Sequence, residues 1–527
     1  MTAQVDAHNA AVAELAAGGD AAAAQARIDA ALAEIDAICG NAGMPDIDAC
    51  LAPLGLVLTP IPAAGTAPVE QVPPAVETPV VDPNAPVDPN APVDPNAPVQ
   101  PDAVDANGQQ VEVVEDLPEG ITQDQLAPVL DSAKDAEVAP MAVEGEAAPE
   151  EAPIEASARV APPETDSAAQ SEEMRSFAAV QAAPLADEAG TAITATDGST
   201  VNQTVVNNYI TNITNNVTNN TQNNTNIGQQ NNVTIVEQAP VQQATAGDLI
   251  TQVILQVGTQ LIVNSVGQDT DRFYDPQEDE VFYENLPGGR VREVVSRPDG
   301  SQVITVRNRN GDVLRRSRVM PDGREIILAS FDDRYDNELL TWRDPGQDLP
   351  PLRLNIPVRE YVLDASYADE NEVQSFFSQP PVEQVTRLYS IDEVKRSARV
   401  RDTVRRLEVG NLTFDTGAAT ISRDQVDALK GVANAMLGLL RTNPAETFLI
   451  EGHTDAVGSD ISNLRLSDVR AATVARILTD FYGVPPENLA TQGYGERYLK
   501  IRTDAGEREN RRVTVRRITP LITVAAN

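Results

Sequence analysis

The chain has 527 residues, of which 38 are proline and only 4% are aromatic, and its formal net charge is −40. This composition excludes a single core over the whole length, because long stretches lack the large apolar side chains that offset the entropy of ordering a chain. The acidity also excludes a basic nucleic-acid-binding protein. It is confined to residues 1–400, since residues 401–527 contain 17 Lys and Arg and 16 Asp and Glu.

Residues 1–55 are predicted to form a helical hairpin. Residues 2–38 are rich in alanine, a strong helix former, and their apolar side chains recur at helical spacing. Gly18 and Gly19 interrupt this pattern and divide it into two arms.

The only two cysteines, Cys39 and Cys50, follow this helical pattern closely. We expect a disulfide between them, which indicates an oxidising compartment, although two reduced thiols would leave the same pattern. The first twenty residues include Asp6 and Glu14 where a signal peptide has a basic start and an apolar centre. The sequence therefore predicts either a processed chain or one that is not exported.

Residues 56–200 are predicted to be a disordered tether of Pro, Ala and acidic residues. The sequence Val-Asp-Pro-Asn-Ala-Pro occurs three times in tandem, beginning at Val81, Val87 and Val93. Proline removes amide donors and favours the extended polyproline II conformation, so the stretch gives reach between two attachment points. A weak helical pattern at 117–134 is either a short docking segment or a transient helix.

Residues 201–270 contain an Asn- and Thr-rich segment followed by an apolar one. Apolar and Asn side chains alternate at spacings of four and three, as in a heptad, at Val206, Ile210, Ile213, Val217, Asn220, Asn224 and Ile227. Three interpretations stay open: a self-associating coiled coil that would make a homo-oligomer, a β-structured stretch, and disorder. The residues 249–266 are predicted to form a buried or interfacial helix, because they include polar side chains that are unfavourable in a membrane span.

Residues 271–345 are predicted to form an antiparallel β-meander, because Pro-Gly, Pro-Asp-Gly and Asn-Gly turn signals separate runs rich in Val, Ile and Arg. A connector with helices follows at 346–403. From 404 to 520 strands and helices alternate: strands are expected at 409–414, 447–452, 489–493 and 511–518, and helices at 423–440 and 463–481. The fold class is therefore α+β, in which a mixed sheet with helices on one face follows the meander and a long, largely disordered arm with an N-terminal helical segment.

Two charged residues of this last region indicate a binding site. Asp455 lies in the loop after a strand, and Arg470 stands in line with the apolar stripe of the second long helix. One acid and one arginine would suit a ligand with adjacent ammonium and carboxylate groups. From the helix pattern alone, Arg470 could equally reach solvent or pair with a protein carboxylate. We expect no metal at His453, because the only other histidine is His8. We also expect no catalysis, because the sequence shows no cluster of a nucleophile, a base and an orienting group.

Several ordered motifs resemble a known family: Gly452-His453-Thr454-Asp455, Asn463, Leu466-Ser467, Arg470-Ala471, Gly493-Tyr494-Gly495 and Asn510-Arg511-Arg512-Val513. They are similar to the OmpA-like peptidoglycan-binding domains over about residues 404–518. The resemblance implies that Asp455 binds the ammonium and Arg470 the carboxylate of wall diaminopimelate. It also implies that the pocket is lined by Thr454, Asn463 and Leu464, with Phe414 and Asp415 as further wall contacts. Of Arg511 and Arg512, one would close the site and the other would pair structurally.

The resemblance predicts a non-catalytic module that anchors an envelope protein or assembly to peptidoglycan. It places the chain in the periplasm or at the outer membrane of a Gram-negative bacterium. An alternative is an oligomeric stalk of the cell envelope, which the wall-binding domain only positions. No cofactor is expected, and the partner of residues 1–200 is not identified by the sequence.

Overall fold

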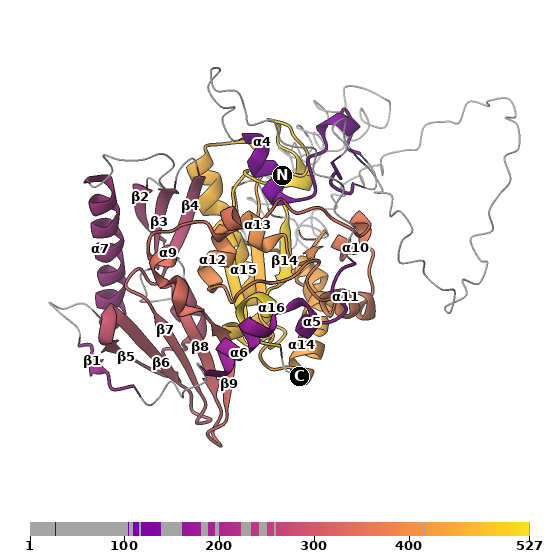
Figure 1. Ribbon diagram of the computed structural model, residues 1–527. Helices are drawn as coiled ribbons and strands as arrows, with labels where there is room; N and C mark the ends of the chain where they lie inside the picture. Colours follow the sequence, from indigo (N-terminus) through magenta and orange to yellow (C-terminus); the bar gives the residue numbers. More distant parts are fainter. Residues whose placement is uncertain are drawn as a thin grey trace, which may run out of the picture. The chain divides into compact units, whose positions relative to one another are not determined.

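The computed structural model describes the ranges 109–138 without 115 and 116, 161–180, 188–194, 200–222, 233–241, 250–257, 260–410 and 412–525 without 413, 415 and 416, together with positions 27 and 104. The chain divides into two units, Met1–Pro92 and Val93–Asn527, and the elements below belong to the second (Figure 1). Apart from position 27, the predicted helical hairpin of 1–55 lies outside the described residues, as does the predicted disulfide between Cys39 and Cys50.

A five-stranded mixed sheet forms the centre of the C-terminal region, as the sequence predicted. Its order is β10-β11-β14-β12-β13, with parallel pairs β10/β11 and β12/β13 and antiparallel pairs β11/β14 and β12/β14. The strands are β10 (Val362–Asp364), β11 (Arg406–Glu408), β12 (Phe448–Gly452), β13 (Leu489–Gly493) and β14 (Val513–Arg517). The first predicted strand, 409–414, is wrong in position: β11 ends at Glu408, and Leu412 and Phe414 are buried outside any strand.

Three helices cover one face of this sheet: α11 (Glu370–Phe377), α14 (Lys430–Thr442) and α15 (Asp460–Asp480). Side chains alternate between the two faces along a strand, so Val513 and Val515 of β14 face these helices. Phe377 of α11 meets Phe448 of β12 edge to face, with 5.3 Å between the ring centroids. Each buried side chain of this kind stabilises the fold by about 1.5–3 kcal/mol relative to exposure.

The opposite face is also covered, by short helices and by pieces of the arm. These are α12 (Ile391–Arg396), α13 (Ala398–Arg401) and α16 (Thr519–Ile522), with α4 (Asp131–Val138), α5 (Asp166–Ala169) and α6 (Glu172–Val180). The long helices lie on one face as predicted, but the sheet is an interior layer between two covered faces.

The predicted disordered tether at 56–200 needs correction at 109–138, at 161–180 and at 188–194, where the strand Thr191–Ala192 pairs with Glu280–Leu286. Residues 109–138 and 161–180 form defined elements that pack on the C-terminal region. In the first stretch Val111 and Leu126 bury against Ile501, and in the second Met174 joins a core with Val394 and Leu521. These few apolar residues were not recognised as contacts, because the arm as a whole is acidic and rich in proline. Of the two interpretations of 117–134, the docking segment is correct.

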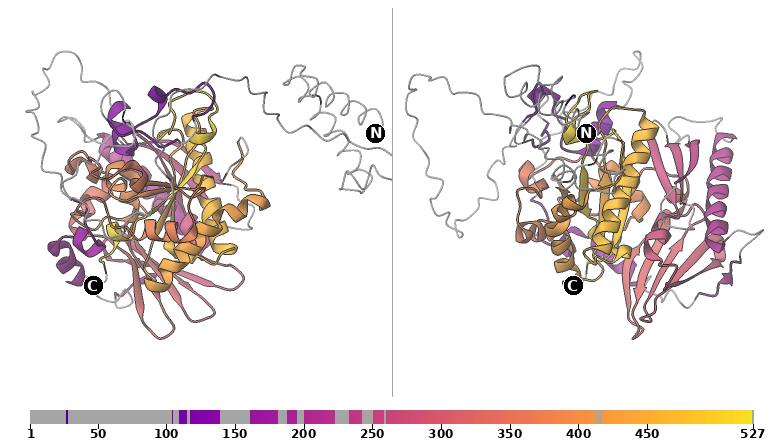
Figure 2. Two further views of the ribbon diagram at one scale, coloured as in Figure 1. Left: turned by 90° about the vertical axis from the view of Figure 1, so that its right-hand side faces the viewer. Right: turned by 180° about the vertical axis from the view of Figure 1, so that it is seen from behind.

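The predicted β-meander is confirmed as a six-stranded antiparallel sheet of order β1-β5-β6-β7-β8-β9. Gly300, Gly311 and Gly323 have positive φ in its turns, as the Pro-Asp-Gly and Asn-Gly signals require. The strands are β1 (Thr191–Ala192), β5 (Glu280–Leu286), β6 (Arg290–Ser296), β7 (Gln302–Arg307), β8 (Val313–Val319) and β9 (Glu325–Ser330). In Figure 2 these pink strands lie beside the orange and yellow elements of the C-terminal region.

The helix predicted at 249–266 is wrong. The segment forms two strands of a three-stranded antiparallel sheet, β2 (Val233–Val241), β3 (Ile250–Val257) and β4 (Gln260–Val266). Val253 and Leu255 pack on one side with Ile213, whereas Ile254 packs on the other with Leu464. A strand that is buried on both faces has no polar alternation, so its sequence resembles an apolar helix.

Within the Asn- and Thr-rich segment, residues Val201–Gln222 form the helix α7, which is the secondary structure that the coiled-coil interpretation requires. Its buried residues Val205, Tyr209, Ile210 and Ile213 pack against Val253, Leu255 and residues of the meander. The described part of the apolar stripe is therefore occupied by the chain's own strands. Self-association through residues 201–270 stays a prediction.

The connector and the loops contain short helices. The α-helices are α8 (Gln268–Phe273), α9 (Asp336–Leu340) and α10 (Val358–Tyr361), and the 3-10 helices are η2 (Gln123–Gln125), η3 (Pro287–Gly289), η4 (Asp333–Tyr335), η5 (Pro345–Asp348), η6 (Arg423–Leu429), η7 (Pro486–Asn488) and η8 (Arg508–Asn510). Within the described ranges, no helix combines the length and the apolar character that a membrane span requires.

Candidate functional site

The backbone at the end of β12 places Asp455 beside two other chain segments. The N–H of His453 donates to the carbonyl of Arg512 at 3.0 Å, and the N–H of Thr454 donates to the carbonyl of Gly495 at 2.9 Å. Gly452 is required here, because a Cβ at this position would lie 2.0 Å from the backbone oxygen of Ser467 in α15. The loop after β12 is thus held tightly between β14 and the loop after β13.

Asp455 is 8% exposed and accepts two hydrogen bonds. Its Oδ2 accepts from Nη1 of Arg511 at 2.7 Å, and its Oδ1 accepts from the N–H of Val457 at 3.3 Å. Gly506 lies over this ion pair, since a Cβ there would be 3.7 Å from Oδ2 of Asp455 and 3.9 Å from Nη1 of Arg511. The carboxylate is therefore held in position by two donors.

Arg470 lies on the buried side of α15 and is only 1% exposed. Its Nε donates to the carbonyl of Ala418 at 2.9 Å, and its guanidinium lies 4.7 Å from the centroid of the Phe414 ring. Burial lowers the pKa of Arg470 to about 10, the positive charge of Arg511 adds to this effect, and Asp455 opposes it. Arg470 still carries its charge at neutral pH.

These contacts place a carboxylate and two guanidinium groups within electrostatic range of each other: Asp455, Arg470 and Arg511. Such a set pairs naturally with a ligand that presents an ammonium next to a carboxylate. The two cations exceed the single anion, so a ligand carboxylate would reduce the repulsion between Arg470 and Arg511.

Glu496 is a neighbour of this site that sequence reasoning missed. Asn463 donates from its side-chain nitrogen to Glu496 and, at 3.3 Å, to the backbone oxygen of Asp455. Burial raises the pKa of Glu496, the bond from Asn463 opposes this, and the nearby Asp460 and Asp455 add to the rise. The position of Glu496 directly after the Gly-Tyr-Gly motif was the available signal.

The OmpA family model matches residues 413–512. This stretch is an OmpA family domain. Outer membrane porin F of Pseudomonas aeruginosa is 33% identical over 86 residues, which cover 16% of this chain and 23% of the porin. The probable lipoprotein YiaD of Escherichia coli is 35% identical over 107 residues, which cover 20% of this chain and 47% of YiaD.

Among solved structures, the peptidoglycan-associated lipoprotein from Burkholderia pseudomallei matches at 25% identity and a TM-score of 0.18, covering 20% of this chain and 86% of that one. The chain spans less than half the length of either curated relative. The likeness therefore concerns the OmpA family domain and not the arm or the meander.

Leu464 and Arg512 make their contacts away from Asp455, and for Arg512 this is the structural role that the prediction gave to one of the two arginines. Leu464 packs with Ile254 and Val263 of the β3–β4 hairpin, so its side chain contacts the hairpin instead. Arg512 is buried on the charged side of the sheet and donates to the carbonyl of Tyr498 at 2.8 Å. Arg511 is the turn residue after η8, and Arg512 leads into β14, so their side chains reach different groups, Asp455 and Glu408.

The remaining predicted residues differ in how much the structure says of them. Phe414 lies beneath Arg470, whereas Asp415 lies outside the described residues. Thr454 is buried, and among the residues that the structure describes its hydroxyl has no hydrogen-bond partner. His453 is also buried, and burial, followed by the charge of Arg512, holds its pKa well below the ordinary value, so the ring is neutral.

A separate polar cavity of about 60 Å³ lies among β4, α7, α8 and the meander. Its lining mixes charges of both signs, including Glu293, Lys395 and Asp468. A volume of this size suits a few water molecules, and it is too small for a sugar or a peptide stem.

Proposed function

We propose that the chain binds peptidoglycan non-covalently through its OmpA family domain and anchors an envelope structure to the wall. The observation that supports this most directly is the buried arrangement of Asp455 and Arg470, two opposite charges from different elements that face the same site. In this proposal Asp455 accepts the ammonium of diaminopimelate and Arg470 donates to its carboxylate.

Arg511 would act as the third charge of the site. Without ligand it pairs with Asp455 at 2.7 Å. The ligand ammonium would share Asp455 with Arg511, and the ligand carboxylate would offset the two guanidinium groups. A ligand with only an ammonium or only a carboxylate would leave part of the site without an opposite charge, so it would bind more weakly.

The matching protein from Burkholderia pseudomallei is a peptidoglycan-associated lipoprotein, and the curated relatives include outer-membrane porins and lipoproteins. These relatives support an envelope location for this chain. An oligomeric stalk through residues 201–270 has less support, because the described stripe of α7 packs within the chain. A monomer by light scattering of the full chain would exclude the stalk.

The proposal is tested by sedimentation of the full chain with purified sacculi. Asp455→Asn removes the charge at nearly constant volume, and Arg470→Lys removes the planar fork while keeping the charge. Each substitution should weaken binding about ten- to a hundredfold, because a charge-assisted hydrogen bond contributes about 1.5–3 kcal/mol.

Matched controls are Asp504→Asn and Arg508→Lys, which make the same changes at exposed positions of the loop after β13. They should bind sacculi like the wild type. If the double variant Asp455→Asn with Arg470→Lys sediments normally and also melts normally, the proposed recognition is wrong.

A further inference from the structure

Residues 109–138 of the acidic arm, called the clasp below, pair with the loop that carries Arg511. The N–H of Ala127 donates to the carbonyl of Lys500 at 3.1 Å, and the N–H of Arg502 donates to the carbonyl of Gln125 at 2.8 Å. Between these two bonds Leu126 packs on Ile501. The clasp therefore adds a short antiparallel bridge to the edge of the loop.

Asn510 connects this bridge to the binding site. Its Oδ1 accepts from the N–H groups of Lys500 and Ile501 at 2.8 and 3.0 Å, and its side-chain nitrogen donates to the carbonyl of Ile501 at 2.8 Å. The next residue along the chain is Arg511, which pairs with Asp455. Hydrogen bonds therefore connect the clasp to Asn510, and the chain itself connects Asn510 to Arg511 and its ion pair with Asp455.

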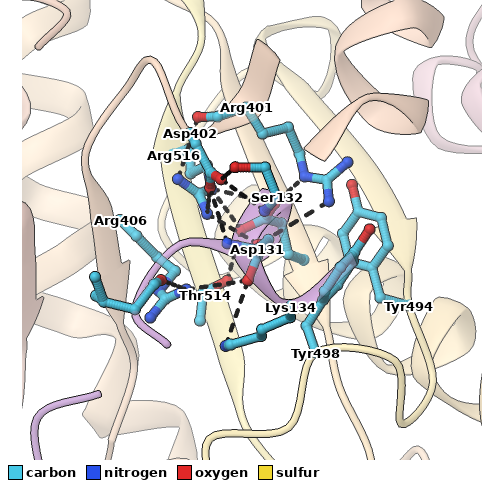
Figure 3. A network of polar contacts seen from close by, with 12 residues as sticks. Asp131, Ser132, Lys134, Arg401, Asp402, Arg406, Tyr494, Tyr498, Thr514 and Arg516 are labelled. Atoms are coloured by element: carbon cyan, nitrogen blue, oxygen red, sulfur yellow. Dashed lines mark hydrogen bonds and ion pairs between the residues drawn. The ribbon is translucent and has the colours of Figure 1, made fainter. Parts of the chain in front are cut away.

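A cluster of buried charges joins the clasp to the sheet, and Figure 3 shows Asp131 and Lys134 of the clasp beside Arg406 and Arg516 of the sheet. The sheet, α13 and the loop contribute five buried cations to the cluster but only three buried carboxylates. The cations are Arg401, Arg406, Lys500, Arg512 and Arg516, and the carboxylates are Asp402, Glu408 and Glu451. Because an unpaired buried charge costs several kcal/mol, this excess of positive charge needs further anions.

The clasp supplies two buried anions, Glu112 and Asp131, together with one buried cation, Lys134, which pairs with Glu112 at 2.5 Å. Glu112 pairs with Arg406 at 2.5 Å, and Asp131 pairs with Arg516 at 3.1 Å and with Arg406 at 3.3 Å. Burial raises the pKa of Asp131, but the combined attraction of Lys134, Arg406, Arg516 and Arg401 outweighs it and holds the pKa below its ordinary value.

A second contact joins the first turn of α4 to the same cluster. The backbone N–H and the hydroxyl of Ser132 donate to Asp402 at 2.8 and 2.7 Å. Farther along α4, Asp135 pairs with Arg497 at 2.8 Å and accepts from the hydroxyl of Tyr498 at 3.3 Å. Two more residues of the loop after β13 are therefore held by the arm.

We infer that the clasp is an integral part of the peptidoglycan-binding domain, in which Asp131 and the backbone of Ala127 are positioning groups that hold residues 497–511 so that Arg511 meets Asp455. The effect on ligand affinity rests on the proposed function, whereas the effect on the loop does not. The binding site and the arm are then coupled, and by reciprocity a ligand at Asp455 stabilises the docked clasp.

Hydrogen–deuterium exchange of the full chain tests this inference with two substitutions. Asp131→Asn weakens the buried ion pairs, and Ala127→Pro removes the N–H that bonds to Lys500 while leaving every charge in place. Both should raise amide exchange in the clasp and in residues 497–511 together, while β12 and β13 keep their protection. Glu137→Gln is the matched control on α4, because its pair with Arg502 is exposed and contributes little.

The second measurement uses a diaminopimelate-containing muropeptide as the probe. In the wild type, a saturating amount should slow exchange in residues 109–138, which a purely structural segment far from the ligand would not show. Ala127→Pro should weaken muropeptide binding about fivefold or more.

The outcomes separate the two proposals. If the wild type does not bind the muropeptide, the proposed function fails, but the exchange of residues 497–511 in the variants still decides the role of the clasp. If these residues keep full protection while the clasp itself exchanges freely in Ala127→Pro, the inference is overturned. A loss of protection in β12 and β13 to the same extent would equally overturn it, because the clasp would then be structural only.

Discussion

The two faces of the five-stranded sheet are held in different ways. On one face, Leu407, Ile450 and Val515 pack against α11, α14 and α15 in an apolar core whose members all lie after residue 372. On the other, an apolar cluster that includes Leu449 and Ala490 lies beside buried ion pairs of Arg406, Glu451 and Arg516, which are completed by an arm segment. Arg516 and Asp131 are 385 positions apart in the sequence.

This difference teaches how each face specifies the fold. An apolar face tolerates any partner of suitable shape, because the hydrophobic effect has no direction. A buried charged face accepts only a segment with complementary charges at fixed positions, because each unpaired charge is penalised. The apolar face thus contributes most of the stability, and the charged face selects which part of a long acidic arm docks.

The largest loss of stability among these tests of the two faces is expected for Arg516→Met. Arg516 is fully buried and lies 3.0 Å from Glu451, 3.1 Å from Asp131 and 3.6 Å from Asp402. Its loss leaves these carboxylates without their main cation, so we expect the free energy of unfolding in urea to fall by about 3–5 kcal/mol. Val515→Ala, the preceding residue on the apolar face, should cost about 2 kcal/mol. Equal losses for the two variants would contradict the proposed difference between the faces.

The second test of the charged face measures how the stability loss caused by Glu408→Gln depends on pH. Burial raises the pKa of Glu408, but Lys500, Arg406 and Arg512 together lower it to about 2 from the ordinary 4.5. A depressed carboxylate pKa stabilises the folded state above the unfolded pKa, and this contribution is lost as pH falls from about 4.5 towards 2.

The Glu408→Gln substitution should therefore cost roughly 3 kcal/mol at pH 7 and progressively less as the pH approaches 2. The measurement is urea unfolding at pH 7, 4 and 3, with Val515→Ala as the reference. Since Val515 does not titrate, its loss should be constant across the series. A pH-independent loss in Glu408→Gln would show that its charge does not matter.

The smallest effect is expected for an exposed ion pair. Arg343 and Asp348 are joined by a hydrogen bond of 2.7 Å, but their side chains are 41% and 56% exposed. Water and salt screen such a pair, so Arg343→Gln should change the free energy of unfolding by less than about 0.5 kcal/mol. A loss as large as that of Glu408→Gln would mean that burial is not what distinguishes the charged face.

The sequence by itself determined the elements with a regular local pattern. Turn signals at nearly even steps defined the meander, and the alternation of strands and helices defined the mixed sheet with its two long helices. The ordered motifs around Asp455 and Arg470 defined the family domain and brought these two residues together in the prediction. These features depend on residues that are close in the chain, so they can be predicted from the amino-acid sequence.

Only the tertiary structure decided the rest. The segment at 249–266 forms a β-hairpin. The sequence did not reveal this, because both faces of the strands are buried and the polar alternation that identifies a strand is therefore missing. Leu464 packs on the β3–β4 hairpin, and Arg512 lies beside Glu408. Both partners are distant in the sequence, so neither contact could be predicted from it. The sequence left the docking of 117–134 as one of two alternatives. It could not decide between them, because a buried carboxylate such as Asp131 is distinguished from a solvated one only by cations from distant strands.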